Sequence, residues 1–350
     1  MSFLLDQIQE KARHESLRSR HGLVVDRNLN KPEQTEHQKL PADQPVQNED
    51  WLKGEPKGKS HKTCLIDVGG GARGIYAAGV QDRLLDEGIC VDLCIGVSAG
   101  SANLANFIAR QKGRTYAFYH DFAYRKEYAS FQNMLRKHSY FDMDYIYSTL
   151  SNADGEYPLD YEKIKESSTE LIVVATNALT GRPAYLDKHR IGQDQYALFK
   201  GSCSVPYLCT ASTIAGIPFC DGTVSDPVPV QKALDLGADR IVVILPRDPE
   251  MEKPSRIMDA SMDFLSHASA YGKAYPQVAR ALKNRVAINN ASFDLARKLE
   301  RQGKLIFVSA HDPRKVRALY GSKEEVRRLY LEGYADGKRA AEFLKEAADS

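Results

Sequence analysis

The sequence predicts an α/β fold, a three-layer α/β/α arrangement with a mostly parallel central sheet. Short apolar runs alternate with longer segments in which apolar residues recur at helical intervals. Strands separated by helices favour a parallel sheet that is covered on both faces. Apolar residues make up 43% of the 350 residues and charged residues 27%, which is the balance of a globular protein with a substantial core.

Each element follows from a local pattern. The expected strands are short runs rich in apolar residues, and they are Cys64–Val68, Asp92–Gly96, Leu171–Thr176, Pro183–Leu186, Arg240–Leu245 and Leu305–Val308. The expected helices have apolar or small residues at helical spacing, and they are Ile75–Leu85, Ala99–Arg110 and Val228–Leu236, with further helical spacing over Arg256–Leu299 and Lys323–Ala347.

The beginning of the chain differs in composition from the rest. From about Glu10 to His61 it is rich in Gln, Glu, Lys, Asp and Pro, with too few apolar residues to bury a core. We therefore expect residues 1–61 to form a polar tail or linker and residues 62–260 to form the α/β domain. Residues 261–350 are expected to be a C-terminal helical extension with one strand, packed on that domain.

Charge and hydropathy exclude several classes of protein. The formal net charge of +2 is too small to indicate nucleic-acid binding. No run of 18 or more apolar residues is present, and the first residues lack the pattern of a signal peptide. We therefore expect a cytoplasmic protein, with or without peripheral contact at the inner membrane surface.

The six cysteines are scattered and none forms a C-x-x-C pair. No histidine cluster accompanies them at the spacing of metal ligands. This pattern is typical of reduced, mostly buried thiols, and it predicts no metal site.

The first motif is a glycine-rich loop, Gly69-Gly70-Gly71-Ala72-Arg73-Gly74, between an expected strand and an expected helix. Three interpretations fit this spacing. A dinucleotide site would need an acidic residue at the end of the next strand, but Asp92 begins that strand. A tight structural turn is the second interpretation. In the third, backbone N–H groups of the loop converge on a developing oxyanion.

The second motif favours the third interpretation. Gly96-Val97-Ser98-Ala99-Gly100 is G-x-S-x-G at a strand-to-helix junction, the pattern of a nucleophile elbow. A sharp turn there lifts the serine hydroxyl above the sheet, and Gly96 and Gly100 avoid collisions with neighbouring backbone. The elbow and the glycine loop then meet at the carboxyl ends of neighbouring strands, where the sites of α/β proteins lie.

A serine nucleophile needs a base. His267 and His311 follow Asp221 in the chain, so a triad with a histidine is one possibility. Asp221 itself is the better candidate, because it follows the apolar segment Ile214–Cys220 and precedes Gly222, which would project its carboxylate from a tight turn. A partly desolvated site would raise its pKa and make it a stronger base.

Three blocks of the chain together resemble the patatin-like phospholipase family, and specifically its compact bacterial branch. They occur in the family's order, and they are Asp67 to Gly74 (oxyanion loop), Gly96 to Gly100 (elbow) and Cys220 to Thr223 (the D-G-A/G block). Further segments resemble the branch, namely Ser202 to Pro206, Val224 to Val230, Tyr275-Pro276, Arg285 with Asn289-Asn290, and Leu329 to Tyr334. Thr223 departs from the pattern, since the family has Gly or Ala there, and the turn that holds Asp221 is expected to be more crowded.

The resemblance implies a serine acyl-ester hydrolase with Ser98 as nucleophile and Asp221 as its only base. It also implies that the loop from Gly69 to Gly74 holds the oxyanion, with Arg73 adding positive potential or pairing with a carboxylate. The implied substrates are lipids or other acyl esters, with no metal or organic cofactor. The alternative from another class of protein is a catalytically silent lipid-binding regulatory module on the same fold.

Two segments bear on the substrate. Lys273 to Lys304 carries eight basic residues against Asp294 and Glu300, and this region either faces anionic lipid headgroups or is an ordinary solvated helix face. Tyr116 to Tyr147 is dense in aromatic residues, which either line an acyl pocket or pack in the core.

Overall fold

The computed structural model describes residues 61–247, 249, 264–265, 267–311 and 322–349. The expected tail, residues 1–61, therefore lies outside the described residues except for His61. Among the described residues, eight strands form one sheet, and their bounds are β1 (Thr63–Asp67), β2 (Leu93–Val97), β3 (Glu170–Asn177), β4 (Pro183–Asp187), β5 (Ser212–Ile214), β6 (Ile217–Asp221), β7 (Arg240–Leu245) and β8 (Leu305–Ser309).

The sheet is mostly parallel, with an antiparallel portion at one side. The strand order is β5-β6-β3-β2-β1-β7-β8, and β4 pairs with β3 off this path. β1 is parallel to β2 and β7, as β2 is to β3 and β7 to β8. The pairs β3–β4, β3–β6 and β5–β6 are antiparallel. The segment Ile214–Cys220 is thus the turn and second strand of a hairpin.

Helices connect the strands and cover the sheet. The α-helices are α2 (Ile75–Asp86), α3 (Ala99–Ile108), α4 (Arg114–Ala117), α5 (Phe131–Lys137), α6 (Tyr161–Glu166), α7 (Ala197–Cys203), α8 (Val230–Asp235), α10 (Ala270–Ala274), α11 (Pro276–Arg301) and α12 (Lys323–Asp349). Short 3-10 or π-helical turns are η2 (Gly71–Gly74), η3 (Phe118–Phe122), η4 (Tyr145–Leu150), η5 (Lys188–Arg190) and η6 (Gly222–Val224).

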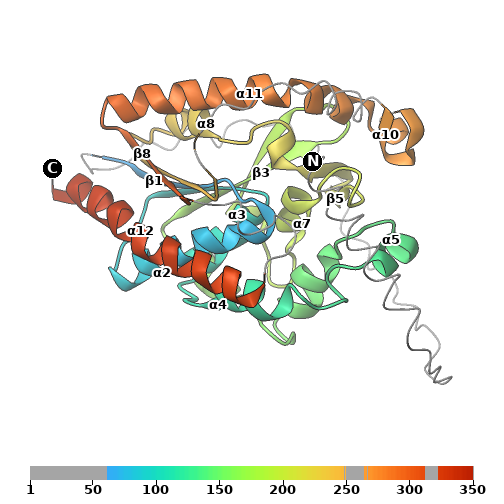
Figure 1. Ribbon diagram of the computed structural model, residues 1–350, viewed down its shortest axis with the longest axis horizontal. Helices are drawn as coiled ribbons and strands as arrows, with labels where there is room; N and C mark the ends of the chain where they lie inside the picture. Colours follow the sequence, from blue (N-terminus) through green and yellow to red (C-terminus); the bar gives the residue numbers. More distant parts are fainter. Residues whose placement is uncertain (1–60, 248, 250–263, 266, 312–321, 350) are drawn as a thin grey trace. The chain divides into compact units, whose positions relative to one another are not determined.

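The two faces of the sheet carry separate apolar cores because side chains alternate along each strand. In β1, Leu65 belongs to one core, whereas Cys64 and Ile66 belong to the other. The first core is closed by α2, α3, α7 and α12, and the second by α8 and α11. Figure 1 shows the two groups of helices on opposite sides of the strands. The expected three-layer α/β/α fold is confirmed.

α2 and α12 pack unusually close together through glycines. A Cβ added at Gly79 would lie 2.1 Å from the carbonyl oxygen of Tyr330, and one added at Gly333 would lie 2.1 Å from that of Tyr76. Since these neighbours are backbone atoms, only glycine fits at either position. The C-terminal helix therefore lies directly on the helix that follows the glycine loop.

The basic and aromatic segments have different surroundings. The basic region falls on α10, α11 and the turn before β8, and seven of its eight basic residues are exposed while Arg285 is half-buried. In the aromatic segment, packing in the core accounts for the side chains that are buried, which are Tyr119, Phe122, Tyr140, Phe141 and Tyr147. The lipid contact and the acyl pocket stay predictions. Within the described part of the chain, we find no helix with both the length and the apolar character needed to span a bilayer.

All six cysteines are free, and Cys90 is the exposed one among them. Burial raises the pKa of the Cys203 and Cys209 thiols to about 12, so these groups are neutral at ordinary pH. The buried thiols therefore act as core side chains.

Candidate active site

Ser98 occupies a strained turn between β2 and α3. Its backbone angles are φ 53° and ψ −134°, a region that side chains with a Cβ rarely adopt. A Cβ added at Gly96 would lie 2.3 Å from the Cα of Ser101, and one added at Gly100 would lie 2.2 Å from the carbonyl oxygen of Asp67. The sharp turn predicted from G-x-S-x-G is therefore present, and both glycines are required by close backbone contacts.

Asp221 is the last residue of β6, and its side chain contacts that of Ser98. The Ser98 hydroxyl donates a hydrogen bond of 2.7 Å to Oδ2 of Asp221. Oδ1 of Asp221 accepts from the backbone N–H of Thr223 at 2.9 Å and from its hydroxyl at 2.7 Å. Gly222 permits the turn, because an added Cβ would lie 2.3 Å from the carbonyl oxygen of Val174. Thr223, the residue that departs from the family pattern, thus holds the carboxylate in place.

Burial raises the pKa of Asp221 above the usual value of an aspartic acid, and the hydrogen bonds from Ser98 and Thr223 oppose this shift. The Asp221 side chain is buried, whereas Ser98 is half-buried. A carboxylate with a raised pKa is a better proton acceptor for a serine hydroxyl than an exposed one. The two side chains therefore form a pair that can generate a nucleophile.

The glycine loop lies against the elbow. Its first three glycines have positive φ, which are 71° at Gly69, 130° at Gly70 and 60° at Gly71. A Cβ added at Gly69 would lie 2.5 Å from the carbonyl oxygen of Val97 and 3.1 Å from the backbone nitrogen of Ala99. Gly70 and Gly71 are exposed to solvent. The loop thus reaches solvent beside the serine.

The second half of the loop is the 3-10 turn η2, which includes Ala72 and Gly74. The backbone N–H of Arg73 donates to the carbonyl of Gly70 at 3.3 Å. Desolvation, and to a smaller extent the positive charge of Arg247, lowers the pKa of the Arg73 guanidinium from its ordinary value. The guanidinium groups of Arg73 and Arg247 are therefore close enough to repel one another, and the role of Arg73 stays a prediction.

Asp67, at the end of β1, anchors the loop from below. Its Oδ1 accepts from the backbone N–H of Gly69 at 2.9 Å. Its Oδ2 accepts from the side-chain amides of Gln81 at 2.9 Å and Asn103 at 3.1 Å. Burial raises the pKa of Asp67 to about 6, although these hydrogen bonds oppose the shift. The sequence offered one signal for this role, an aspartate inside an otherwise apolar strand.

Ser202, at the end of α7, supports the elbow. The backbone N–H of Ser98 donates to Oγ of Ser202 at 2.9 Å, and the Ser202 hydroxyl donates to the carbonyl of Val174 at 2.7 Å. Two residues later, the carbonyl of Ser204 accepts from the backbone N–H of Asp221 at 2.9 Å. The segment from Ser202 to Ser204 therefore supports the backbone of both Ser98 and Asp221.

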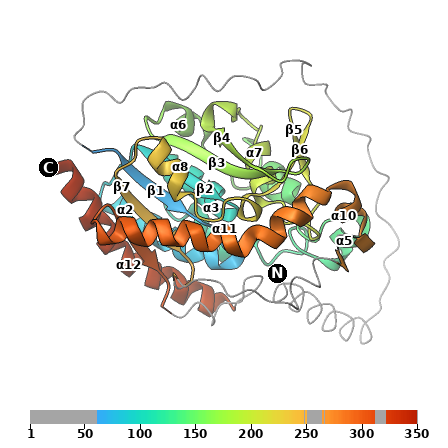
Figure 2. The same ribbon diagram turned by 90° about the horizontal axis from the view of Figure 1, so that it is seen from above.

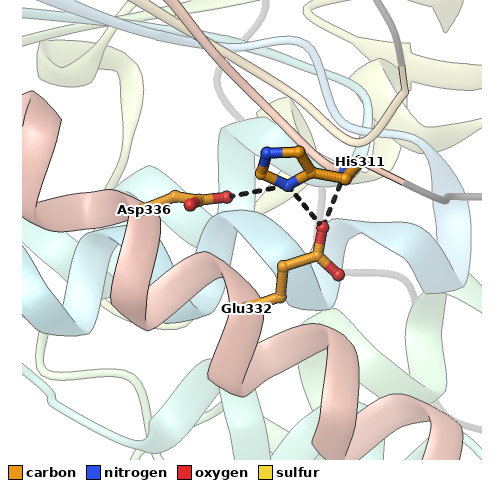
Figure 3. Close-up of side chains that lie close together, drawn as sticks. All are labelled: His311, Glu332 and Asp336. Carbon is orange, nitrogen blue, oxygen red and sulfur yellow. Dashed lines mark hydrogen bonds and ion pairs between the residues drawn. The ribbon is translucent and has the colours of Figure 1, made fainter.

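The histidines of the alternative triad have other surroundings. His311 is 78% exposed, and its Nδ1 lies 3.1 Å from Oε1 of Glu332 and 3.7 Å from Oδ2 of Asp336 (Figure 3). Both carboxylates come from α12. His267 is exposed and precedes α10. The Ser98 hydroxyl donates instead to Asp221.

His311, Glu332 and Asp336 are close enough to share a metal ion. Both carboxylates already accept hydrogen bonds. The backbone N–H of His311 donates to Glu332 at 2.7 Å, and the Tyr76 hydroxyl donates to Asp336 at 2.7 Å. This group is a link between the end of β8 and α12.

Comparisons with known proteins give family matches for two parts of the chain. A family model described as patatin-like phospholipase matches residues 68–234, and one described as a domain of unknown function (DUF6363) matches residues 275–348. The chain is 27% identical over 188 residues to the uncharacterized protein YjjU of Escherichia coli K12, which covers 52% of this chain and 51% of that protein. The chain thus spans about half the length of this curated relative.

Among solved structures, the chain is similar to VipD from Legionella pneumophila. The TM-score is 0.38 and the sequence identity 15%, with 82% of this chain and 67% of that chain covered. The patatin-like match contains Ser98, Asp221 and the whole glycine loop from Gly69 to Gly74. Residues 68–234 of the chain therefore match the patatin-like phospholipase domain.

Proposed function

We propose that this protein is a serine acyl-ester hydrolase that acts on lipids, of the phospholipase A or lysophospholipase type, through a Ser98–Asp221 dyad. The observation that carries the proposal is the 2.7 Å hydrogen bond from the Ser98 hydroxyl to a buried carboxylate, at a strained elbow beside the glycine loop. Nucleophile, base and loop then lie within one site, as acyl transfer requires.

In the first half of the reaction, Oγ of Ser98 attacks the ester carbonyl carbon while its proton passes to Asp221. The negative oxygen is held by the backbone N–H groups of Gly70, Gly71 and Ala72, since those of Gly69 and Arg73 already donate within the loop. Each such donor contributes about 3 kcal/mol to transition-state stabilisation. The bond to the alcohol then breaks, and Asp221 returns the proton to the leaving oxygen.

In the second half, a water molecule replaces the alcohol. Asp221 takes a proton from this water as its oxygen attacks the acyl-serine carbonyl. The intermediate collapses to free acid, and the proton returns to Oγ of Ser98. The raised pKa of Asp221 favours its part as acceptor and donor in turn.

The first experiment tests the dyad with matched variants. Ser98→Ala should abolish hydrolysis of nitrophenyl esters and lysophospholipids, and labelling by a fluorophosphonate probe, without loss of fold. Asp221→Asn should lower turnover by roughly a hundredfold or more, because an amide cannot accept the proton. His267→Ala and His311→Ala are the controls and should stay within a few-fold of the unmodified chain.

Two outcomes would contradict the proposal. An inactive, folded His267→Ala or His311→Ala variant would replace the dyad with a triad, since members of a catalytic unit fail together. A folded chain that neither hydrolyses any ester of the panel nor reacts with the fluorophosphonate would favour the alternative, a catalytically silent lipid-binding module.

A further inference from the structure

The segment from Tyr128 to Asp142, which contains α5, leaves the body of the domain and returns to the same place. We call this segment the excursion. At its base, the backbone N–H of Asp142 donates to the carbonyl of Tyr128 at 2.7 Å. One step further out, the N–H of Ser130 donates to the carbonyl of Tyr140 at 3.2 Å. α5 therefore forms the tip of an excursion whose two ends are fastened together.

The base of this excursion is joined to the site. The backbone N–H of Tyr140 donates to the carbonyl of Leu208 at 2.6 Å. Leu208 lies four residues after Ser204, whose carbonyl accepts from the backbone N–H of Asp221. One short segment, Ser204 to Leu208, thus connects the excursion to the catalytic carboxylate.

The tip exposes large apolar side chains. α5 has no buried residue, and Phe131 is 46% exposed and Leu135 67% exposed. Residues four apart lie on the same side of a helix, so Phe131 and Leu135 form one apolar face. Adjacent exposed apolar side chains make this face of α5 a candidate binding surface.

The tip of the excursion carries positive charge. Ser130 to Ser139 contains Arg136, Lys137 and His138, and neither Asp nor Glu. Lys137 pairs with Asp142 at the base, while Arg136 is exposed at the tip. Both views place α10, which carries the exposed Lys273, at the same end of the described domain as α5 (Figures 1 and 2). Apolar side chains beside exposed cations fit a surface of anionic lipid headgroups.

We propose that α5 is the element by which this protein docks on an anionic lipid surface. Phe131 and Leu135 enter the headgroup region, and Arg136 lies at the level of the lipid phosphates. The base of the excursion is joined to the segment that holds Asp221. Docking through α5 therefore brings the active site next to lipid molecules that have not left the membrane. The benefit of docking for catalysis rests on the proposed function. Binding to the lipid surface does not require hydrolysis.

Binding is measured on the full chain in the Ser98→Ala background, so that vesicles stay intact. The protein should sediment with phosphatidylglycerol–phosphatidylcholine vesicles and far less with pure phosphatidylcholine. Leu135→Glu should weaken binding about tenfold, since it replaces an apolar contact with a repelled charge. Arg136→Glu should also weaken it, and binding should fall as salt rises, because charges are screened over about 10 Å at 0.1 M salt. Leu331→Glu is the matched control, an exposed leucine on α12 that should bind as the parent does.

Activity gives an independent measure in chains that keep Ser98. The ratio of vesicle-lipid hydrolysis to hydrolysis of a dissolved short-chain ester should fall at least about fivefold in Leu135→Glu and stay constant in Leu331→Glu. Vesicle binding through Leu135 in a chain without any hydrolytic activity would remove the proposed function and leave the docking surface in place.

Two results would overturn the docking surface. One is equal vesicle binding by Leu135→Glu and Leu331→Glu in folded protein, as judged by circular dichroism. The other is a dimer, seen by light scattering, that Leu135→Glu dissociates without any change in vesicle binding. In that case the apolar face of α5 would be a contact between two copies of this chain.

Discussion

Asp67 shows how one buried carboxylate organises several parts of the site. It accepts hydrogen bonds from the glycine loop, from α2 through Gln81 and from α3 through Asn103. Burial of a charge is costly even when it is hydrogen-bonded, and this cost appears as its raised pKa. The residue that fixes the loop therefore makes folding depend on pH.

In the folded chain, burial raises the pKa of Asp67 to about 6, from an ordinary value of 3.8. Between these values the folded chain holds a proton that the unfolded chain has lost, so this group makes stability fall as pH rises from about 4 to 6. Asp67→Asn removes the contribution, which is at most about 3 kcal/mol. Urea unfolding at several pH values should therefore give a flatter pH dependence for the variant.

Asp226 offers a comparison for this measurement. Burial also raises its pKa to about 6, against a hydrogen bond from Tyr185. Asp226→Asn should flatten the same pH range, and the double variant should flatten it further. If the free energy of unfolding depends on pH in the same way for Asp67→Asn and the unmodified chain, Asp67 has the same pKa in the folded and unfolded states.

Residues whose position depends on local sequence were predictable. Ser98 and its glycines occupy consecutive positions, and Asp221 follows a strand and precedes a glycine. The residues that hold Ser98 and Asp221 in place were not predictable in the same way. Ser202 reaches the backbone of Ser98 from 104 positions away in the chain. Such a partner is set by the order of strands and helices in space, which no local pattern contains.

At the scale of elements, the contact of α2 with α12 depends on the absence of side chains. An Ala in place of Gly333 would favour the helix itself by about 1 kcal/mol. Its Cβ would also lie 2.1 Å from a backbone oxygen of Tyr76, and relief needs a shift of one whole helix. Overpacking of this kind costs about 1–3 kcal/mol or more, so the clash outweighs the gain in propensity.

We therefore expect Gly333→Ala to lower the free energy of unfolding by about 2 kcal/mol, measured by urea denaturation. The control is Arg328→Ala, an exposed substitution on the same helix that should change stability by less than about 0.5 kcal/mol. A stabilised Gly333→Ala variant would show that α12 can move away from α2 at little cost.

The elements differ in how well the sequence predicted them. The parallel strands and α2, α3 and α12 begin within a residue or two of their predicted starts, because strong apolar periodicity and glycines mark their ends. The antiparallel part of the sheet that contains β5 and β6 was harder to predict from the sequence. No residue of β5 is buried, and the pairing of β6 with β3 depends on tertiary structure. α5 is a short helix without a buried residue, and it was not predicted from the sequence.

At the scale of the whole molecule, the expected C-terminal extension shares both cores with the α/β domain. Phe293 and Leu299 of α11 and Phe307 of β8 belong to one core, and Val326 and Leu344 of α12 belong to the other. β8 also continues the sheet beside β7. We propose that residues 62–260 and 261–350 are regions of sequence that fold as one unit.

This proposal predicts a single heat-absorption peak for residues 62–350 in calorimetry of the full chain, with equal calorimetric and van't Hoff enthalpies. Residues 62–260 expressed alone should be insoluble or lack a cooperative transition, since both cores would be open. Two separate transitions assigned to these regions would contradict the shared cores.

The position of β1 in the sheet has a consequence for synthesis of the chain. β1 is made early and can pair with β2 soon afterwards, through Cys64 with Leu93. Its other neighbour is β7, which pairs Thr63 with Arg240, so this edge stays open until Arg240 has left the ribosome. An open apolar strand edge pairs readily with other chains. Translation that stops before Arg240 should therefore yield aggregating fragments, and slow elongation in this region should increase the demand for chaperones.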